Sequence, residues 1–185
     1  KLSLSKFLGF ISSVYTTIVR GVPELLIIYL IFFGGSAAVM KVAKAFGYFG
    51  YIELNAFIIS IIAIGVISAT YSTEVLRAAV LAIDRGQFEA AKTLGLRKIH
   101  IFFKILIPQV LRYAIPGLGN VWQVTLKDTA LISVTGLVEI MRQTRISSNV
   151  EHSPLTFLVT AACLYLFLTT FSGKIFNHLE RKVNK

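Results

Sequence analysis

Residues 86–108 read GQFEAAKTLGLRKIHIFFKILIP, and this stretch indicates more about the chain than any other. Its marked positions are Gly86, Glu89, Ala90, Ala91, Gly95, Ile105 and Pro108. The stretch is basic, yet apolar runs long enough to be membrane spans lie on both sides of it. A charged loop with a glycine, held between two spans, is a surface that a membrane protein can present to a soluble partner.

The composition is that of an integral membrane protein. Of 185 residues, 55% are hydrophobic and only 15% are charged, and the mean hydropathy is +0.73, whereas soluble domains carry about 25% charged residues. The net charge of +10 does not indicate nucleic-acid binding, because the basic residues gather in short segments beside apolar runs and form no basic face. We therefore expect a lipid bilayer around the chain and no nucleic-acid partner.

Four apolar segments are long enough to cross a bilayer as helices, which takes about 20 residues. They cover residues 22–40, 54–73, 113–138 and 155–173. The amphipathic segment before the first is either an interfacial helix or the beginning of that span. The sequence predicts an all-α membrane protein with a single transmembrane domain over residues 1–185.

The distribution of Lys and Arg predicts the orientation of the chain. Seven basic residues lie in segment 77–112, and four more follow Gly173, ending with Lys185. Cytoplasmic loops are enriched in Lys and Arg, so we expect both segments in the cytoplasm, which agrees with the two spans between them. Loops 41–53 and 139–154 are then external.

The cytoplasmic loop, about residues 84–112, is predicted to fold as two helices joined by a turn. Residues 86–88 lead into a first helix over residues 89–94, which Ala and Leu favour, and Gly95 suits the left-handed position that ends a helix. Glu89, near the start of this helix, is expected to complement the helix dipole. Pro108 is expected to break or kink the second helix before the chain re-enters the membrane.

The spacing from Glu89 to Pro108 resembles the signature loop of permease subunits of ATP-driven importers, which is Glu-Ala-Ala, three residues, Gly, nine residues and Ile-x-Leu-Pro. The chain departs from this pattern only at Ile107. Further segments resemble polar amino acid importers in the same order: Arg20-Gly21-Val22-Pro23-Glu24-Leu25-Leu26, Thr70-Tyr71-Ser72-Thr73-Glu74-Val75-Leu76-Arg77, Gly86-Gln87, Pro108-Gln109, Pro116-Gly117-Leu118-Gly119-Asn120 and Lys127-Asp128-Thr129-Ala130-Leu131. The segments at Pro23 and Lys127 are most similar to the branch that handles histidine, arginine, lysine or opines.

This resemblance implies a type I importer-like helix bundle in the cytoplasmic (inner) membrane of a bacterium, which translocates polar, cationic amino acids. It implies four kinds of neighbour: a second permease subunit, homologous or identical, two ATP-binding subunits, an external amino-acid-binding protein and the bilayer. In the family, the short loop helix lies in a cleft of the ATPase, where Glu89 would pair with a basic group and the small Ala90 and Ala91 would permit close approach. The family usually has one more span before the Arg-Gly-x-Pro segment, and we expect that span to be missing here through truncation.

Nothing in the sequence indicates a catalytic site, a metal site or a cofactor of the chain itself. There is no Gly-x-x-x-x-Gly-Lys-Ser/Thr loop, so we expect ATP and Mg to be bound by the partner ATPase. Cys163 is the only cysteine, and the three histidines lack metal-ligand spacing. A membrane enzyme, or a channel or structural membrane protein without an ATPase partner, would leave the ordered loop spacing unexplained.

Ionisable residues at membrane depth are the candidate substrate contacts, because burying them in a bilayer is costly. The candidates are Glu24, Glu74, Lys127 and Asp128, with Trp122 and Gln123 one turn from Asp128. A carboxylate would attract a cationic side chain, and an aromatic face would stack on a guanidinium. The alternatives are structural: Glu74 pairs with Arg77, Lys127 pairs with Asp128, and Trp122 only packs.

Small residues predict close contacts between the spans. Gly34, Gly35, Gly117 and Gly119 permit close approach of neighbouring helices, and Pro116 indicates a kink beside the last two.

Overall fold

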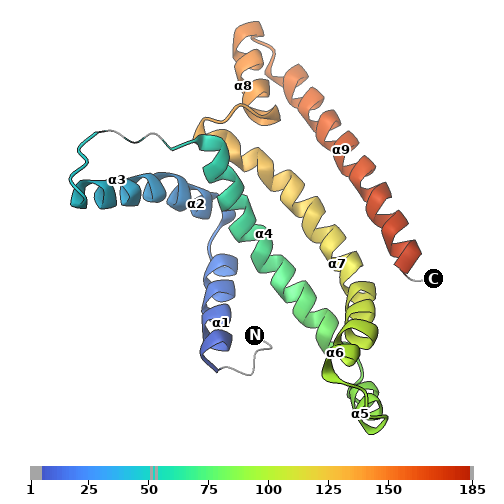
Figure 1. Cartoon of the computed structure of the whole chain (residues 1–185). Helices are drawn as coiled ribbons and strands as arrows, with labels where there is room; N and C mark the ends of the chain where they lie inside the picture. Colours follow the sequence, from blue (N-terminus) through green and yellow to red (C-terminus); the bar gives the residue numbers. More distant parts are fainter. Residues whose placement is uncertain (1–5, 51, 53, 184–185) are drawn as a thin grey trace.

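The computed structural model describes residues 6–50, 52 and 54–183, and these residues form helices joined by short loops (Figure 1). The remaining positions of the predicted domain, among them Lys185 of the basic tail, lie outside the described residues. The α-helices are α1 (Lys6–Gly21), α2 (Glu24–Tyr29), α3 (Gly35–Ala45), α4 (Ala56–Leu81), α5 (Arg85–Thr93), α6 (Lys98–His100), α7 (Ile107–Asp128), α8 (Ile140–Glu151) and α9 (Pro154–Val183). Two π-helical segments, η1 (Leu30–Gly34) and η2 (Ile101–Leu106), and one 3-10 segment, η3 (Thr129–Thr135), connect some of them.

Four continuous helical runs are long and apolar enough to cross a membrane, which agrees with the four predicted spans. They are Glu24–Ala45, Ala56–Leu81, Lys98–Thr135 and Pro154–Val183. The last three extend beyond the predicted apolar segments, because each helix continues into flanking residues that include charged ones. For example, α4 includes Glu74 and Arg77.

Helices α4, α7 and α9 run side by side and make the most extensive contacts in the molecule (Figure 1). The isoleucines Ile27 and Ile28 of α2 pack with Ala63 and Ile67 of α4 and form a buried apolar cluster. Helix α3 projects away from the three long helices (Figure 1). The cluster therefore fixes the second half of α2 against α4.

The amphipathic segment before Pro23 forms a helix of its own, α1, and is not the beginning of the first span. It packs on α4, where the Tyr15 hydroxyl donates a hydrogen bond to the Val66 carbonyl at 2.5 Å. Pro23 lies between α1 and α2, where a proline ends a preceding helix easily.

The two segments that are predicted to be cytoplasmic lie at the same end of the bundle. Helix α5 and the C-terminal end of α9 are at one end, and α8 is at the other (Figure 1). The Arg112 Nε in α7 donates a hydrogen bond to the Val183 carbonyl at the end of α9, at 3.1 Å. This is the arrangement that the predicted topology requires.

Of the break or kink that we expected at Pro108, the break does not occur. Pro108 is the second residue of α7, and the helix continues from Lys98 through η2 into α7. A proline lacks the N–H group that an α-helix needs, and its ring crowds the carbonyl four residues earlier. The wider π-helical turn over Ile101–Leu106 precedes the proline and absorbs this mismatch without ending the helix.

The close approach expected at glycines occurs in α7 but not in the first span. A Cβ atom on Gly117 would lie 2.6 Å from Val75 Cγ1 in α4, and one on Gly119 would lie 3.1 Å from Phe176 Cδ1 in α9. Around Gly34 and Gly35 the described residues place nothing within 4 Å, so the prediction for these two glycines is wrong within this chain. Their helix projects away from the bundle.

We predict that Gly117→Ala lowers the stability of the protein by about 1–3 kcal/mol, because the added methyl group overlaps a β-branched side chain that cannot move aside. Gly35→Ala is the matched control, since the same change there meets open space and improves helix propensity. Thermal unfolding of both variants in detergent measures the difference. Equal stability of the two would contradict the close α4–α7 contact.

Candidate functional site

The candidate coupling helix α5 has a defined start and a defined end. At its start, Asp84 is the N-cap and its Oδ1 accepts a hydrogen bond from the Gly86 N–H at 2.7 Å. At its end, Gly95 adopts φ +72°, the Gly95 N–H donates to the Lys92 carbonyl at 3.0 Å, and the Leu96 N–H donates to the Ala91 carbonyl at 3.1 Å. This is the Schellman arrangement, and it confirms the turn predicted at Gly95.

Two expectations about α5 are wrong. Glu89 is the fifth residue of α5, so it lies beyond the first turn, where a carboxylate would meet the helix dipole. Asp84 occupies that place instead, because the helix begins one residue before Gly86. Ala91 is buried within the chain, so of the two alanines only Ala90, like Glu89, is exposed to a partner.

Apolar side chains around the Gly95 turn are unexpectedly exposed. Leu94 is 78% exposed, and Leu96 and Ile99 are also largely exposed. Leu94 and Leu96 lie between two spans, outside the long apolar runs, and Ile99 is the second residue of the run that begins at Lys98. Exposed leucines at such a place are typical of contacts with another protein. The sequence carried a signal for them, since leucines flank a glycine within a basic loop.

The other marked loop residues lie where the loop joins the third span. Ile105 is half-buried in η2, and Pro108 opens α7. Next to Pro108, the Gln109 Nε2 donates a hydrogen bond to the Gln87 Oε1 in α5 at 2.6 Å.

The structure brings together two of the candidate carboxylates, which lie far apart in the sequence. The Tyr71 hydroxyl in α4 donates a hydrogen bond to the Glu24 Oε1 in α2 at 2.9 Å. Segment η3, which directly follows Asp128 at the end of α7, packs against α2, so the Asp128 and Glu24 carboxylates lie near enough to repel each other. We call Glu24, Tyr71 and Asp128 the carboxylate cluster. Sequence analysis missed Tyr71, although it lies within a segment of the family pattern.

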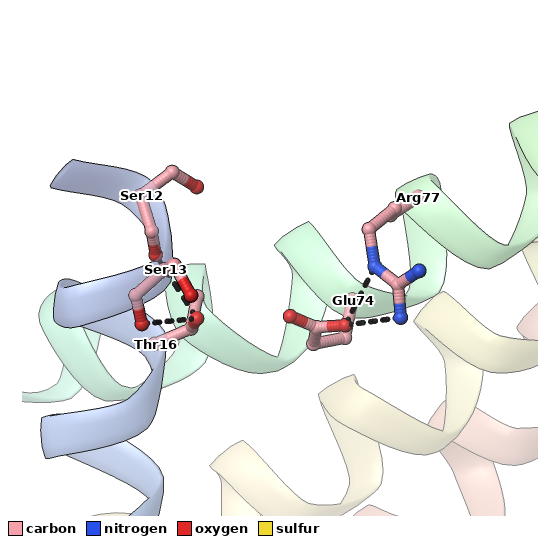
Figure 2. A network of polar contacts seen from close by, with 5 residues as sticks. All are labelled: Ser12, Ser13, Thr16, Glu74 and Arg77. Carbon is pink, nitrogen blue, oxygen red and sulfur yellow. Dashed lines mark hydrogen bonds and ion pairs between the residues drawn. The ribbon is translucent and has the colours of Figure 1, made fainter. Parts of the chain in front are cut away.

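Glu74 is not part of the carboxylate cluster. Its carboxylate accepts a hydrogen bond from the Arg77 Nε at 2.9 Å and forms an ion pair with Nη2 at 2.8 Å, one turn along α4. Figure 2 shows this pair and, on α1, the buried Thr16 hydroxyl donating to the main-chain carbonyls of Ser12 and Ser13. The structural alternative weighed for Glu74 is therefore the one observed.

Trp122 and Gln123 face α9 and lie apart from Asp128. The Trp122 ring packs against Phe176 with centroids 6.4 Å apart, and the Gln123 Nε2 donates to the Thr169 carbonyl at 2.9 Å. Lys127 is exposed and attracts Asp128 electrostatically, without a direct ion pair between them among the described residues. These contacts give Trp122 and Gln123 a structural role in holding α7 on α9.

Comparison with protein families decides what kind of membrane protein this is. Residues 2–185 match the family described as the binding-protein-dependent transport system inner membrane component. The chain belongs to this family.

Members of this family with named substrates are similar over nearly the whole chain. A nopaline transport system permease protein from Agrobacterium fabrum is 50% identical over 186 residues, which cover 100% of this chain and 79% of the relative. An octopine transport system permease protein from Rhizobium radiobacter is 48% identical over 181 residues, covering 98% and 76%. A histidine/lysine/arginine/ornithine transport system permease protein from Escherichia coli is 38% identical over 182 residues, covering 98% and 79%.

A solved structure shares the fold. The crystal structure of an amino acid ABC transporter with histidines superposes with a TM-score of 0.81 at 30% identity, covering 98% of this chain and 79% of that chain. The predicted all-helical importer-like bundle is confirmed.

As a family member, the chain is a multi-pass permease component of the inner membrane. ATP is bound and hydrolysed by a partner ATPase, and a binding protein is the other partner of the system. These findings confirm the predicted family and these two kinds of partner.

We predict that Tyr71→Phe lowers stability by about 1 kcal/mol, because it removes a hydrogen bond between two membrane helices while keeping the ring. Tyr113→Phe in α7 is the control, since that side chain is 51% exposed. Thermal unfolding in detergent compares the two, and an unaffected Tyr71→Phe protein would mean that this contact does not hold α2 on α4.

Proposed function

We propose that this permease translocates a polar, cationic amino acid or an opine, together with a second permease subunit that is identical or homologous, and two ATP-binding subunits. The named substrates of the relatives support this substrate class: nopaline, octopine, and the group of histidine, lysine, arginine and ornithine. These compounds share a polar amino acid core, and the cationic side chains of lysine, arginine and ornithine would be attracted by a carboxylate in the pathway.

The observation that carries this proposal is the carboxylate cluster. Glu24 and Asp128 come from different helices, are both half-buried, and lie in runs that are apolar enough to span a membrane. Two neighbouring carboxylates repel each other, and burying them is costly unless a cation compensates. A cationic substrate passing the cluster supplies that charge. Glu74 is a weaker candidate, because Arg77 already neutralises it.

We propose that α5 and the Gly95 turn dock the ATPase. Support comes from the exposed Glu89 and Ala90, from the exposed leucines beside Gly95, and from the rigid caps at both ends of α5. Gly86 and Gly95 serve these caps, the buried Ala91 and the half-buried Ile105 pack within the chain, and Pro108 lies in the first turn of α7. The residues proposed for coupling thus divide into a docking face and its support.

The mechanism follows from how the loop is connected. Helix α5 lies between the end of α4 and the beginning of the run that becomes α7, and these two helices also carry Tyr71 and Asp128. ATP binding that moves α5 therefore acts on two of the three helices that form the cluster. Transport is driven only if substrate affinity differs between the two resulting states, and a shift of the cluster toward or away from water changes that affinity.

We predict that Asp128→Asn and Glu24→Gln reduce uptake of arginine or lysine at least tenfold more than uptake of a neutral analogue, because an amide attracts a cation far less than a carboxylate does. Glu74→Gln is the matched control and should change the uptake ratio little. The measurement is competitive uptake into proteoliposomes that contain the full complex. An unchanged ratio in all three variants would refute the role of the cluster in reading substrate charge.

We predict that Gly95→Val uncouples transport, because a β-branched residue at φ +72° is strained by about 1–3 kcal/mol. Gly95→Asn is the control, since Asn tolerates this conformation better. Substrate-stimulated ATP hydrolysis by the reconstituted complex should fall in the Val variant and persist largely in the Asn variant. Full stimulation in the Val variant would contradict docking through this turn.

A further inference from the structure

Two glutamines connect the candidate coupling helix to the third span. Gln87 lies in α5, and Gln109 lies 22 residues later in the first turn of α7. The Gln109 Nε2 donates a hydrogen bond to the Gln87 Oε1 at 2.6 Å. Each glutamine directly follows a marked residue, Gly86 or Pro108, but no docking or substrate contact described above uses either side chain.

Helix α5 has few other attachments within the chain. Among the described residues, no other helix packs extensively against it, and short segments, residues 82–84 and 94–97, join it to its neighbours. Buried Ile83 and Ala91 fix its base. A nine-residue helix held in this way can turn on its two joints when a partner pushes it, so its displacement need not reach the spans.

We propose that the Gln87–Gln109 hydrogen bond makes α5 and α7 move together, so that a displacement of α5 by the ATPase is delivered to α7. This inference rests on the proposed docking role of α5. The bond crosses from α5 to α7 past the Gly95 turn and the π-helical segment, the parts of the loop best able to bend. Helix α7 rises about 33 Å over its 22 residues and ends at Asp128, so a push at Gln109 reaches the carboxylate cluster.

The chemistry of the pair suits a joint that works in every transport cycle. Each carboxamide has both a donor and an acceptor, so the bond can re-form after the two helices slide. The pair is exposed, and water competes for the same groups, so the bond favours one geometry without locking it. Gln87 and Gln109 are positioning residues in this scheme, because they act through α7 and not on the substrate.

The test uses the complete complex, with its second permease, ATPase and binding protein, in proteoliposomes. The readout is the ratio of substrate-stimulated to basal ATP hydrolysis, with co-purification of the ATPase measured alongside. We expect Gln109→Leu and Gln87→Leu each to lower this ratio about fivefold while the ATPase still co-purifies. The double variant should lose no more than either single one, because both remove the same bond.

A charge pair provides the rescue, and a distant glutamine provides the control. Gln87→Glu combined with Gln109→Lys replaces the hydrogen bond by an ion pair and should restore at least half of the lost stimulation. Gln143→Leu in α8 should leave the ratio unchanged, because its side chain contacts Ser147 in the same helix at 3.4 Å, at the opposite end of the bundle.

Gln109→Leu decides the question, because Gln109 lies on the span and not on α5. Normal coupling in this variant, additive losses in the double variant, failure of the charge pair to restore stimulation, or loss of the ATPase on purification would each overturn the proposal. If Gly95→Val uncouples transport while Gln109→Leu does not, the result supports docking of the ATPase by α5 and contradicts transmission through the Gln87–Gln109 hydrogen bond. If neither variant uncouples transport, the proposed docking role of α5 is contradicted as well.

Discussion

The packing of α4 against α7 is the contact on which the rest of the structure depends. At Gly117 the two helices approach so closely that no Cβ atom fits beside Val75. Helix association in a bilayer depends on such van der Waals contacts between small residues, since lipid tails are as apolar as the side chains they would replace. A hydrogen bond between the Thr125 and Ser68 hydroxyls, 3.1 Å long, joins the same two helices further along.

The α4–α7 contact holds together the carboxylate cluster and the loop that contains α5. Toward one end of the α4–α7 pair lies the carboxylate cluster, to which α2 adds Glu24 through Tyr71. At the other end the two helices are joined through α5, whose caps fix its length and its exposed face. Helix α9 supports α7 from the other side, through Phe176 at Gly119 and through the Gln123 hydrogen bond to Thr169. In the proposed mechanism, a movement of the loop would therefore reach the carboxylates through a pair of packed helices.

The division of labour in the family explains why the chain has no site for ATP. The membrane component needs a pathway, a docking surface and a connection between them, while hydrolysis belongs to a partner subunit. The exposed leucines beside Gly95 and the half-buried carboxylates fit the first two needs. Both are unfavourable for an isolated chain, since exposed apolar groups and clustered charges are stabilised only by something that binds them.

The sequence by itself determined the class, the four spans, the family and the turn at Gly95, because these depend on local properties: hydropathy over about 20 residues, residue spacing, and the tolerance of glycine for positive φ. The sequence did not determine which polar side chains lie close together. Glu24, Tyr71 and Asp128 are separated by tens of residues, and only the packing of α2, α4 and α7 placed them together. Tertiary structure also decided that Ala91 is buried, that a Cβ atom on Gly34 or Gly35 would meet open space within this chain, and that the helix continues past Pro108. In each case the outcome depends on neighbours far away in the sequence or on a π-helical turn, and neither leaves a mark in local residue patterns.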